Sequence, residues 1–103
     1  MTHTAAALTA LGDPTRQEIL DRLKAGPKPV GVLASDMPVS RSAVSQHLKV
    51  LKDAGLVRDR QEGTRRIYEV DPDGIRQLRA YFDSFWDQAL AAFRDAVEEE
   101  QER

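Results

Sequence analysis

The sequence predicts a mainly α-helical domain that carries one two-stranded β-hairpin. Apolar residues recur at helical spacing over most of the chain, and Asp, Ser, Gly and Pro stand where those patterns begin and end. One segment, residues 56–70, instead contains strand-like alternation around a glycine. The 103 residues suffice for a single domain, residues 1–103, and bury a modest fraction of their surface, so a partner subunit would add stability.

Two helices are expected in the first quarter of the chain. The first covers about residues 4–11, with Leu8 and Leu11 on one side. The second has a clear start, because Asp13 can cap it and Pro14 follows at the first helical position, where no N–H is needed. Its apolar side consists of Ile19, Leu20 and Leu23.

A helix-turn-helix is expected over about residues 30–54. A short helix near residues 30–36 offers Val32 and Leu33 to the core, and a turn containing proline follows it. Ser40 then caps a longer helix. Apolar residues recur in that helix at the spacing of one buried face, at Val44, Leu48 and Leu51.

A hairpin and a long helix complete the chain. Strands at residues 56–61 and 65–70 form a wing over about residues 56–70, and an Asp-Pro pair then starts a helix over about residues 72–98. The apolar residues of this helix are Ile75, Leu78, Phe82, Phe85, Trp86, Ala89, Leu90, Phe93 and Val97. Four helices, a hairpin and a helix in this order make a winged helix-turn-helix.

The composition excludes several kinds of site. A hydrophobic share of 41% and a charged share of 31% are those of an ordinary soluble domain, and the absence of cysteine removes disulfides and thiolate metal sites. The two histidines, His3 and His47, have no further ligand nearby, so we expect no metal and no cofactor. Because no apolar run reaches transmembrane length and no signal pattern begins the chain, we expect a cytoplasmic protein without a membrane partner.

The charge is distributed unevenly along the chain, although the total is only −2. Residues 1–39 carry four basic and four acidic side chains, whereas residues 40–66 carry seven basic and three acidic ones. Residues 67–103 carry four basic and ten acidic side chains. A local basic face matters more for binding DNA than the total charge does.

The helix after Ser40 has a polar side made of short hydrogen-bonding side chains and cations. Gln can pair with adenine, Ser with bases or phosphates, and Arg or Lys with guanine or phosphates. A solvated helix face would carry the same residue types, so the neighbouring turn and wing favour the DNA interpretation. We predict DNA contacts from Ser40, Arg41, Ser42, Ser45, Gln46, His47 and Lys49. For His47, a role in orienting the helix remains an alternative.

The wing also concentrates cations. Arg58 and Arg60 precede its tip, and an exposed basic tip can follow a phosphate backbone or enter a minor groove. Charge on an edge hairpin can equally protect it against aggregation, and the two roles are compatible. The predicted DNA contacts of the wing are Thr64, Arg65 and Arg66.

Aromatic residues on the last helix predict a dimer interface. Its predicted members are Leu8, Leu11, Phe82, Phe85, Trp86, Leu90 and Phe93. The alternative is that these side chains fill the core of the monomer. A two-fold dimer would set two recognition helices roughly 34 Å apart and prefer a pseudo-palindromic operator in double-stranded DNA. Nothing in the sequence requires a small-molecule effector between the aromatics.

The carboxylates do not predict an enzyme. Asp83, Asp87 and the acidic run at residues 98–102 have no clustered partner, no nucleophile and no glycine-rich phosphate loop beside them. A solvated acidic helix face explains them, and we expect no catalytic site.

The chain resembles the ArsR/SmtB family of small bacterial winged-helix repressors over nearly its whole length. The resemblance implies a homodimer paired through its first and last helices, with the fourth helix in the major groove, and it implies repression. Metal-sensing members carry cysteines in the third helix or Asp and His ligands along the last one, and this chain has neither pattern, so it resembles the metal-independent members. The matching pieces are Leu11-Gly12-Asp13-Pro14-Thr15-Arg16 with Ile19-Leu20, Ser42 to Leu51, Ala54-Gly55-Leu56-Val57, and a wing ending in Tyr68.

Two functional hypotheses follow. The first is a sequence-specific, homodimeric transcriptional repressor that occludes a promoter. The second is a winged-helix module that docks another protein through its hairpin or aromatic helix, without specific DNA binding. The basic middle third argues against the second, and an enzyme ranks well behind both.

Overall fold

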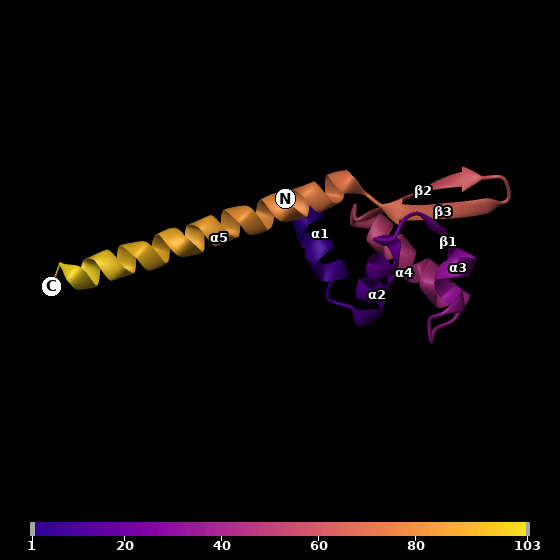
Figure 1. The fold of residues 1–103 in the computed structure, drawn as a ribbon, viewed down its shortest axis with the longest axis horizontal. Coiled ribbons are helices and arrows are strands. Elements are labelled where there is room, and N and C mark those ends of the chain that lie inside the picture. The colour runs from indigo at the N-terminus through magenta and orange to yellow at the C-terminus, as the bar shows by residue number, and fades with distance from the viewer. Residues whose placement is uncertain (1, 103) are drawn as a thin grey trace.

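A computed structural model describes residues 2–102 and shows four short helices and a small sheet followed by one long helix (Figure 1). The elements are α1 (Thr2–Ala10), α2 (Pro14–Leu23), β1 (Lys28–Pro29), α3 (Val30–Ser35), α4 (Arg41–Asp53), β2 (Val57–Glu62), β3 (Arg65–Val70) and α5 (Pro72–Gln101). The predicted winged helix-turn-helix order is therefore confirmed, with one additional strand.

The helix starts lie where the capping residues predict them. The Asp13 carboxylate accepts hydrogen bonds from the backbone N–H groups of Thr15 and Arg16, at 2.8 and 3.1 Å, and Pro14 is the first residue of α2. The Ser40 hydroxyl accepts from the N–H of Ala43 at 3.1 Å at the start of α4. These bonds satisfy N–H groups that a helix end leaves without partners.

The core forms where α4 packs against α2, α3 and β2. Its largest fully buried side chains are Ile19, Leu33, Val44, Leu48, Leu51, Leu56 and Val57. The prediction for Val32 is wrong, because 45% of this residue is exposed. The six-residue α3 turns only one side inward, and Val30 and Leu33, three positions apart, occupy that side.

The sheet has three strands rather than the predicted two, in the order β1-β3-β2. The additional strand β1 pairs Lys28 with Tyr68 and Pro29 with Ile67, and so ties the start of α3 to the wing. The β2–β3 hairpin turns at Gly63, whose φ of 61° suits the first central position of a two-residue type II′ turn, where glycine is preferred.

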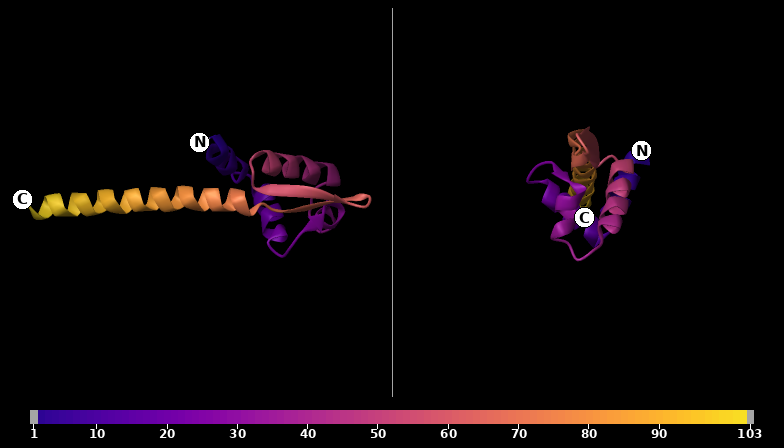
Figure 2. Two further views of the ribbon diagram at one scale, coloured as in Figure 1. Left: turned by 90° about the horizontal axis from the view of Figure 1, so that it is seen from above. Right: turned by 90° about the vertical axis from the view of Figure 1, so that its right-hand side faces the viewer.

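Helix α5 projects away from the rest of the molecule as a single rod (Figures 1 and 2). It has 30 residues and extends three residues beyond the predicted end, to Gln101. None of its residues is buried, and its main contact with another helix is with α1. The molecule is therefore elongated, with extents of 69 × 26 × 24 Å. Within residues 2–102, no helix is long and apolar enough to cross a membrane.

A close backbone approach holds the base of α5. The N–H of Asp71 donates to the carbonyl of Leu56 at 2.9 Å, and Gly74 packs on the backbone of Gly55. A Cβ placed on Gly74 would overlap the Gly55 carbonyl oxygen, so a glycine is required there. This contact connects the end of α4 to the start of α5.

We expect Gly74→Ala to lower the free energy of unfolding by about 1–3 kcal/mol, because overpacking against rigid backbone forces the first turn of α5 to move. Chemical denaturation measures the change. Gly31→Ala is the matched control, since a Cβ there meets only the Arg41 side chain at ordinary contact distances and should be neutral or stabilise by up to about 1 kcal/mol. Equal effects of the two substitutions would contradict the close approach.

Candidate nucleic-acid interface

Burial of one side of α4 leaves its polar side in solvent. Val44, Leu48 and Leu51 are fully buried, and the predicted contact residues on the other sides of the helix are exposed: Ser40, Arg41, Ser42, Ser45, Gln46 and Lys49. The Lys49 ammonium lies 2.9 Å from the carboxylate of Asp53, one turn along the same helix. An exposed pair of this kind is weak and leaves the lysine able to exchange partners.

His47 differs from the other predicted residues because it is half-buried. It lies close enough to Asp13, the cap of α2, to affect that carboxylate. The pKa of Asp13 is lowered mainly by the N–H of Arg16, and the charge of His47 contributes a smaller part. This placement supports the alternative in which His47 orients α4 against α2.

Asp59 joins α4 to both strands of the hairpin. One of its carboxylate oxygens lies 2.9 Å from the Lys52 ammonium on α4, and the other lies 3.0 Å from the Arg66 guanidinium on β3. Only 8% of the Asp59 side chain is exposed. The hydrogen bond from Lys52, followed by that from Arg66, holds the pKa of Asp59 below its usual value. Both contacts are to charged groups, which make the stronger hydrogen bonds.

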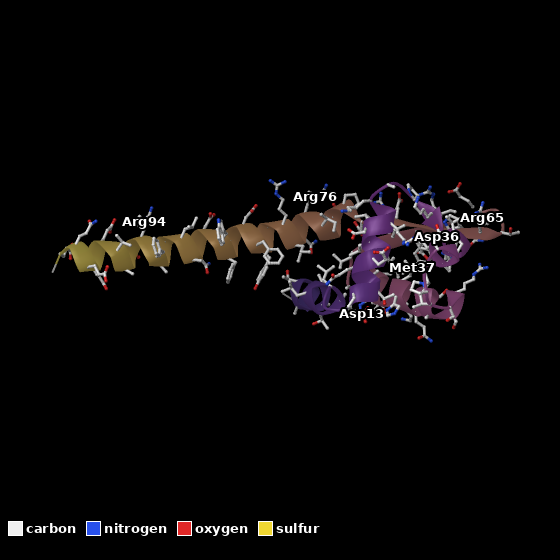
Figure 3. The ribbon with its side chains drawn as sticks, turned by 60° about the horizontal axis from the view of Figure 1, so that its bottom comes forward. Asp13, Asp36, Met37, Arg65, Arg76 and Arg94 are labelled. Carbon is white, nitrogen blue, oxygen red and sulfur yellow. The ribbon has the colours of Figure 1, made fainter. Side chains whose placement is uncertain are left out.

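The opposite face of the hairpin is largely neutralised. Arg58 and Arg60 both reach the Glu69 carboxylate, at 3.1 and 3.0 Å, and Arg60 also lies 2.9 Å from Glu62. Among residues 2–102, by contrast, Arg41 and Arg65 have no ion-pair partner within 4.0 Å. Figure 3 shows Arg65 at the hairpin end of the molecule. The cations free to meet an anion are therefore fewer than the sequence count indicates.

Sequence reasoning missed two residues that belong to this surface. The first is Lys52, which lines a groove between α4 and the sheet together with the predicted residue Ser45. The two are seven positions apart on one face of α4, and this helical spacing could have revealed the lysine. Gln61 lies beside Thr64 and Arg65 near the hairpin tip. Nothing in the sequence distinguished Gln61 from its neighbours.

The predicted interface residues of α5 do not fill the monomer core, so that alternative is wrong for this helix. Between 49 and 69% of each is exposed: Phe82, Phe85, Trp86, Leu90 and Phe93. From α1, Leu8 is half-buried, and Leu11 packs partly against the core. The aromatic side of α5 is thus an apolar surface that this single chain leaves in contact with water.

Within the described residues, no group of three or more His, Cys, Asp or Glu side chains is arranged to hold a metal ion. Asp13, the carboxylate near His47, is already engaged as the cap of α2.

Comparison with known proteins assigns the fold to a family. A family model of a helix-turn-helix domain matches residues 11–60. The chain is 54% identical over 94 residues to the HTH-type transcriptional regulator Rv2034 of Mycobacterium tuberculosis, which covers 91% of this chain and 88% of that protein. The ArsR-like transcriptional regulator from Rhodococcus sp. RHA1 superposes with a TM-score of 0.75 at 31% identity, over 91% of this chain and 92% of that one. The chain belongs to the ArsR family.

This ArsR-family chain is a winged helix-turn-helix transcriptional regulator with a DNA-binding fold. A further structure, the homodimeric winged helix-turn-helix DNA-binding domain of Mb0332 from Mycobacterium bovis, is similar with a TM-score of 0.69 and 31% identity, covering 86% of this chain and 82% of that one. The family resemblance expected from the sequence is confirmed.

We expect Asp59→Asn to lower the free energy of unfolding by about 1–2 kcal/mol at pH 7, because two charge-assisted hydrogen bonds are lost from partly exposed partners. The folded pKa lies below the unfolded value of about 3.9, so the carboxylate stabilises the regulator above that value and ceases to do so as pH falls through the folded pKa. The difference between the two proteins should therefore shrink below about pH 4, which urea denaturation at several pH values measures.

Asp53→Asn is the control for this comparison, since its exposed pair with Lys49 should change stability little at any pH. A loss for Asp59→Asn that is the same at pH 7 and pH 3 would contradict the role of the ionised carboxylate.

Proposed function

We propose that the regulator is a homodimeric, sequence-specific repressor that occludes a promoter. The observation that carries this proposal is the exposed polar side of α4, held outward by the fully buried Val44, Leu48 and Leu51 on its other side. A helix fixed in this way can enter a major groove as a rigid unit. Repression rather than activation is what the family resemblance implies. Such a protein would act in the cytoplasm, where the chromosome is.

The residues divide by the chemistry that they can offer to DNA. Gln46, Ser42 and Ser45 are exposed, uncharged hydrogen-bonding groups suited to base edges. The cations Arg41, Lys49, Arg65 and Arg66, together with the hydroxyl of Thr64, suit phosphates. Ser40 already accepts a hydrogen bond as the helix cap and keeps only its O–H for DNA.

The aromatic side of α5 supports a homodimer. Exposed apolar surface of this extent is unfavourable in water, and a second copy of α5 would cover it. The homodimeric domain of Mb0332 has the same fold. In a two-fold pair the α4 helices would meet successive major grooves, roughly 34 Å apart, on a pseudo-palindromic operator.

The competing function is protein docking without specific DNA binding. DNA binding through phosphates releases counterions, so the affinity falls steeply as salt is added. The slope of log affinity against log salt concentration is about −0.9 for each phosphate neutralised. Fluorescence anisotropy with the regulator's own upstream DNA and with scrambled DNA, at several salt concentrations, tests the proposal. Tight binding that prefers the upstream DNA to the scrambled DNA and weakens steeply with salt supports the proposal. Absence of binding to any duplex at low salt favours the docking function.

We expect Gln46→Ala to relax sequence preference at one position of the operator, with discrimination there falling by about 1–3 kcal/mol, because a bidentate contact to a base edge is lost. A systematic panel of single-base operator variants measures this preference. Gln101→Ala, at the end of α5, serves as the control. An unchanged preference profile in Gln46→Ala would mean that this side chain does not contact a base.

We expect Phe85→Glu to shift the dimer towards monomer, since it would bury an unpaired charge in the interface. Sedimentation velocity over a range of concentrations measures the shift. Ser84→Glu is the control, because it adds the same charge at an exposed position about 100° or more around α5 from every predicted interface residue of that helix. A profile of Phe85→Glu like that of the wild type would contradict this interface.

A further inference from the structure

A cleft lies between the start of α3 and the wing. It encloses about 490 Å³, and the residues lining it come from the end of β1, the first turns of α3 and α4, and the hairpin tip. Its members are Pro29, Val30, Gly31, Val32, Arg41, Gln61, Thr64, Arg65 and Arg66. The cleft joins the two predicted contact regions, the start of α4 and the wing.

The charge of the cleft is of one sign. Three arginines line it and no carboxylate does, although the whole chain has a net charge of −2. Arg66 has its guanidinium bound by Asp59, whereas Arg41 and Arg65 have no ion pair with any residue of the described chain. Like charges gathered around one space repel each other, and an anion between them removes that repulsion.

The backbone leaves room for this arrangement. At α3, the Arg41 guanidinium lies over Gly31, where an added Cβ would be 3.7 Å from its Nη1 atom. At the wing, β1 pairs only with Ile67 and Tyr68, so the edge of β3 at Arg66 and Arg65 is not covered by β1. The cleft therefore opens where β1 ends, and both Arg41 from α4 and Arg65 from β3 line it.

We propose that this cleft holds one phosphate of the DNA backbone, contacted by Arg41 from the recognition helix and by Arg65 from the wing. The planar guanidinium fork matches phosphate oxygens, and a phosphate contact fixes register and orientation without reading sequence. One phosphate would thus set the angle between α4 and the wing on the duplex. The inference rests on the proposed DNA-binding function and specifies which two cations share a phosphate.

A double-substitution cycle tests the sharing. Wild type, Arg41→Gln, Arg65→Gln and the double variant are compared by anisotropy on scrambled duplex DNA over a range of salt. If one phosphate is shared, either arginine alone still neutralises it, so each single variant keeps most of the salt slope. In the double variant the slope of log affinity against log salt concentration should fall in magnitude by about 0.9 per cleft, which is more than the sum of the two single changes. Arg94→Gln, far along α5 (Figure 3), controls for loss of one arginine charge.

The other outcomes are distinct from one another. Single losses of about 0.9 each that add in the double variant would overturn the shared phosphate, and an unchanged slope in the double variant would overturn the cleft as a phosphate site. In both cases the DNA-binding function would stand if the affinity of the wild type for DNA still fell steeply with salt. A wild type whose DNA affinity did not depend on salt would refute that function itself. Inorganic phosphate should displace DNA from the wild type, but not from the double variant, beyond the effect of chloride at equal ionic strength, because it competes with the backbone phosphate for the cleft.

Discussion

The burial of one side of α4 is the constraint on which the rest of the structure depends. Val44, Leu48 and Leu51 are each 0% exposed, and they meet side chains from α2, α3 and β2 in a single core. Because close-packed interiors resist rotation of a helix about its axis, the polar side of α4 has one fixed direction. The helix caps, the short α3 and the hairpin all serve to hold this direction.

The parts of the fold that could be predicted from sequence are those with local causes. Asp13 and Ser40 cap helices through bonds to residues two or three positions away, so their sequence context suffices. Strand β1 was missed because two residues carry no periodicity, and its pairing with Ile67 and Tyr68 is long-range. In the sequence Asp59 is one acidic residue in a basic segment, since its contact with Lys52 exists only once β2 packs beside α4. The convergence of Arg41 and Arg65 was hidden for the same reason.

Helix α5 leaves most of its apolar residues outside the core of the chain. Its base is fixed by the approach of Gly74 to Gly55. Among the apolar residues of α5, only Leu78 packs against the core cluster. Ile75, Leu78, Phe82, Phe85 and Ala89 alternate at spacings of three and four, the pattern of a helix seam that meets another helix. The isolated chain therefore leaves unused the apolar surface that a domain of this size needs for stability.

The two ends of the elongated molecule carry opposite charge. Residues 80–102 hold seven acidic side chains and one basic one, and the hairpin tip lies at the other end of the chain's long axis (Figure 1). This separation gives the chain an electric dipole moment, and the field of a polyanion would orient that dipole so that the hairpin end points toward the polyanion. Such alignment acts during diffusion and fades as salt shortens the screening length, to about 8 Å at physiological ionic strength. The acidic end of α5, far from the proposed contact residues, would therefore influence how often collisions with DNA are productive.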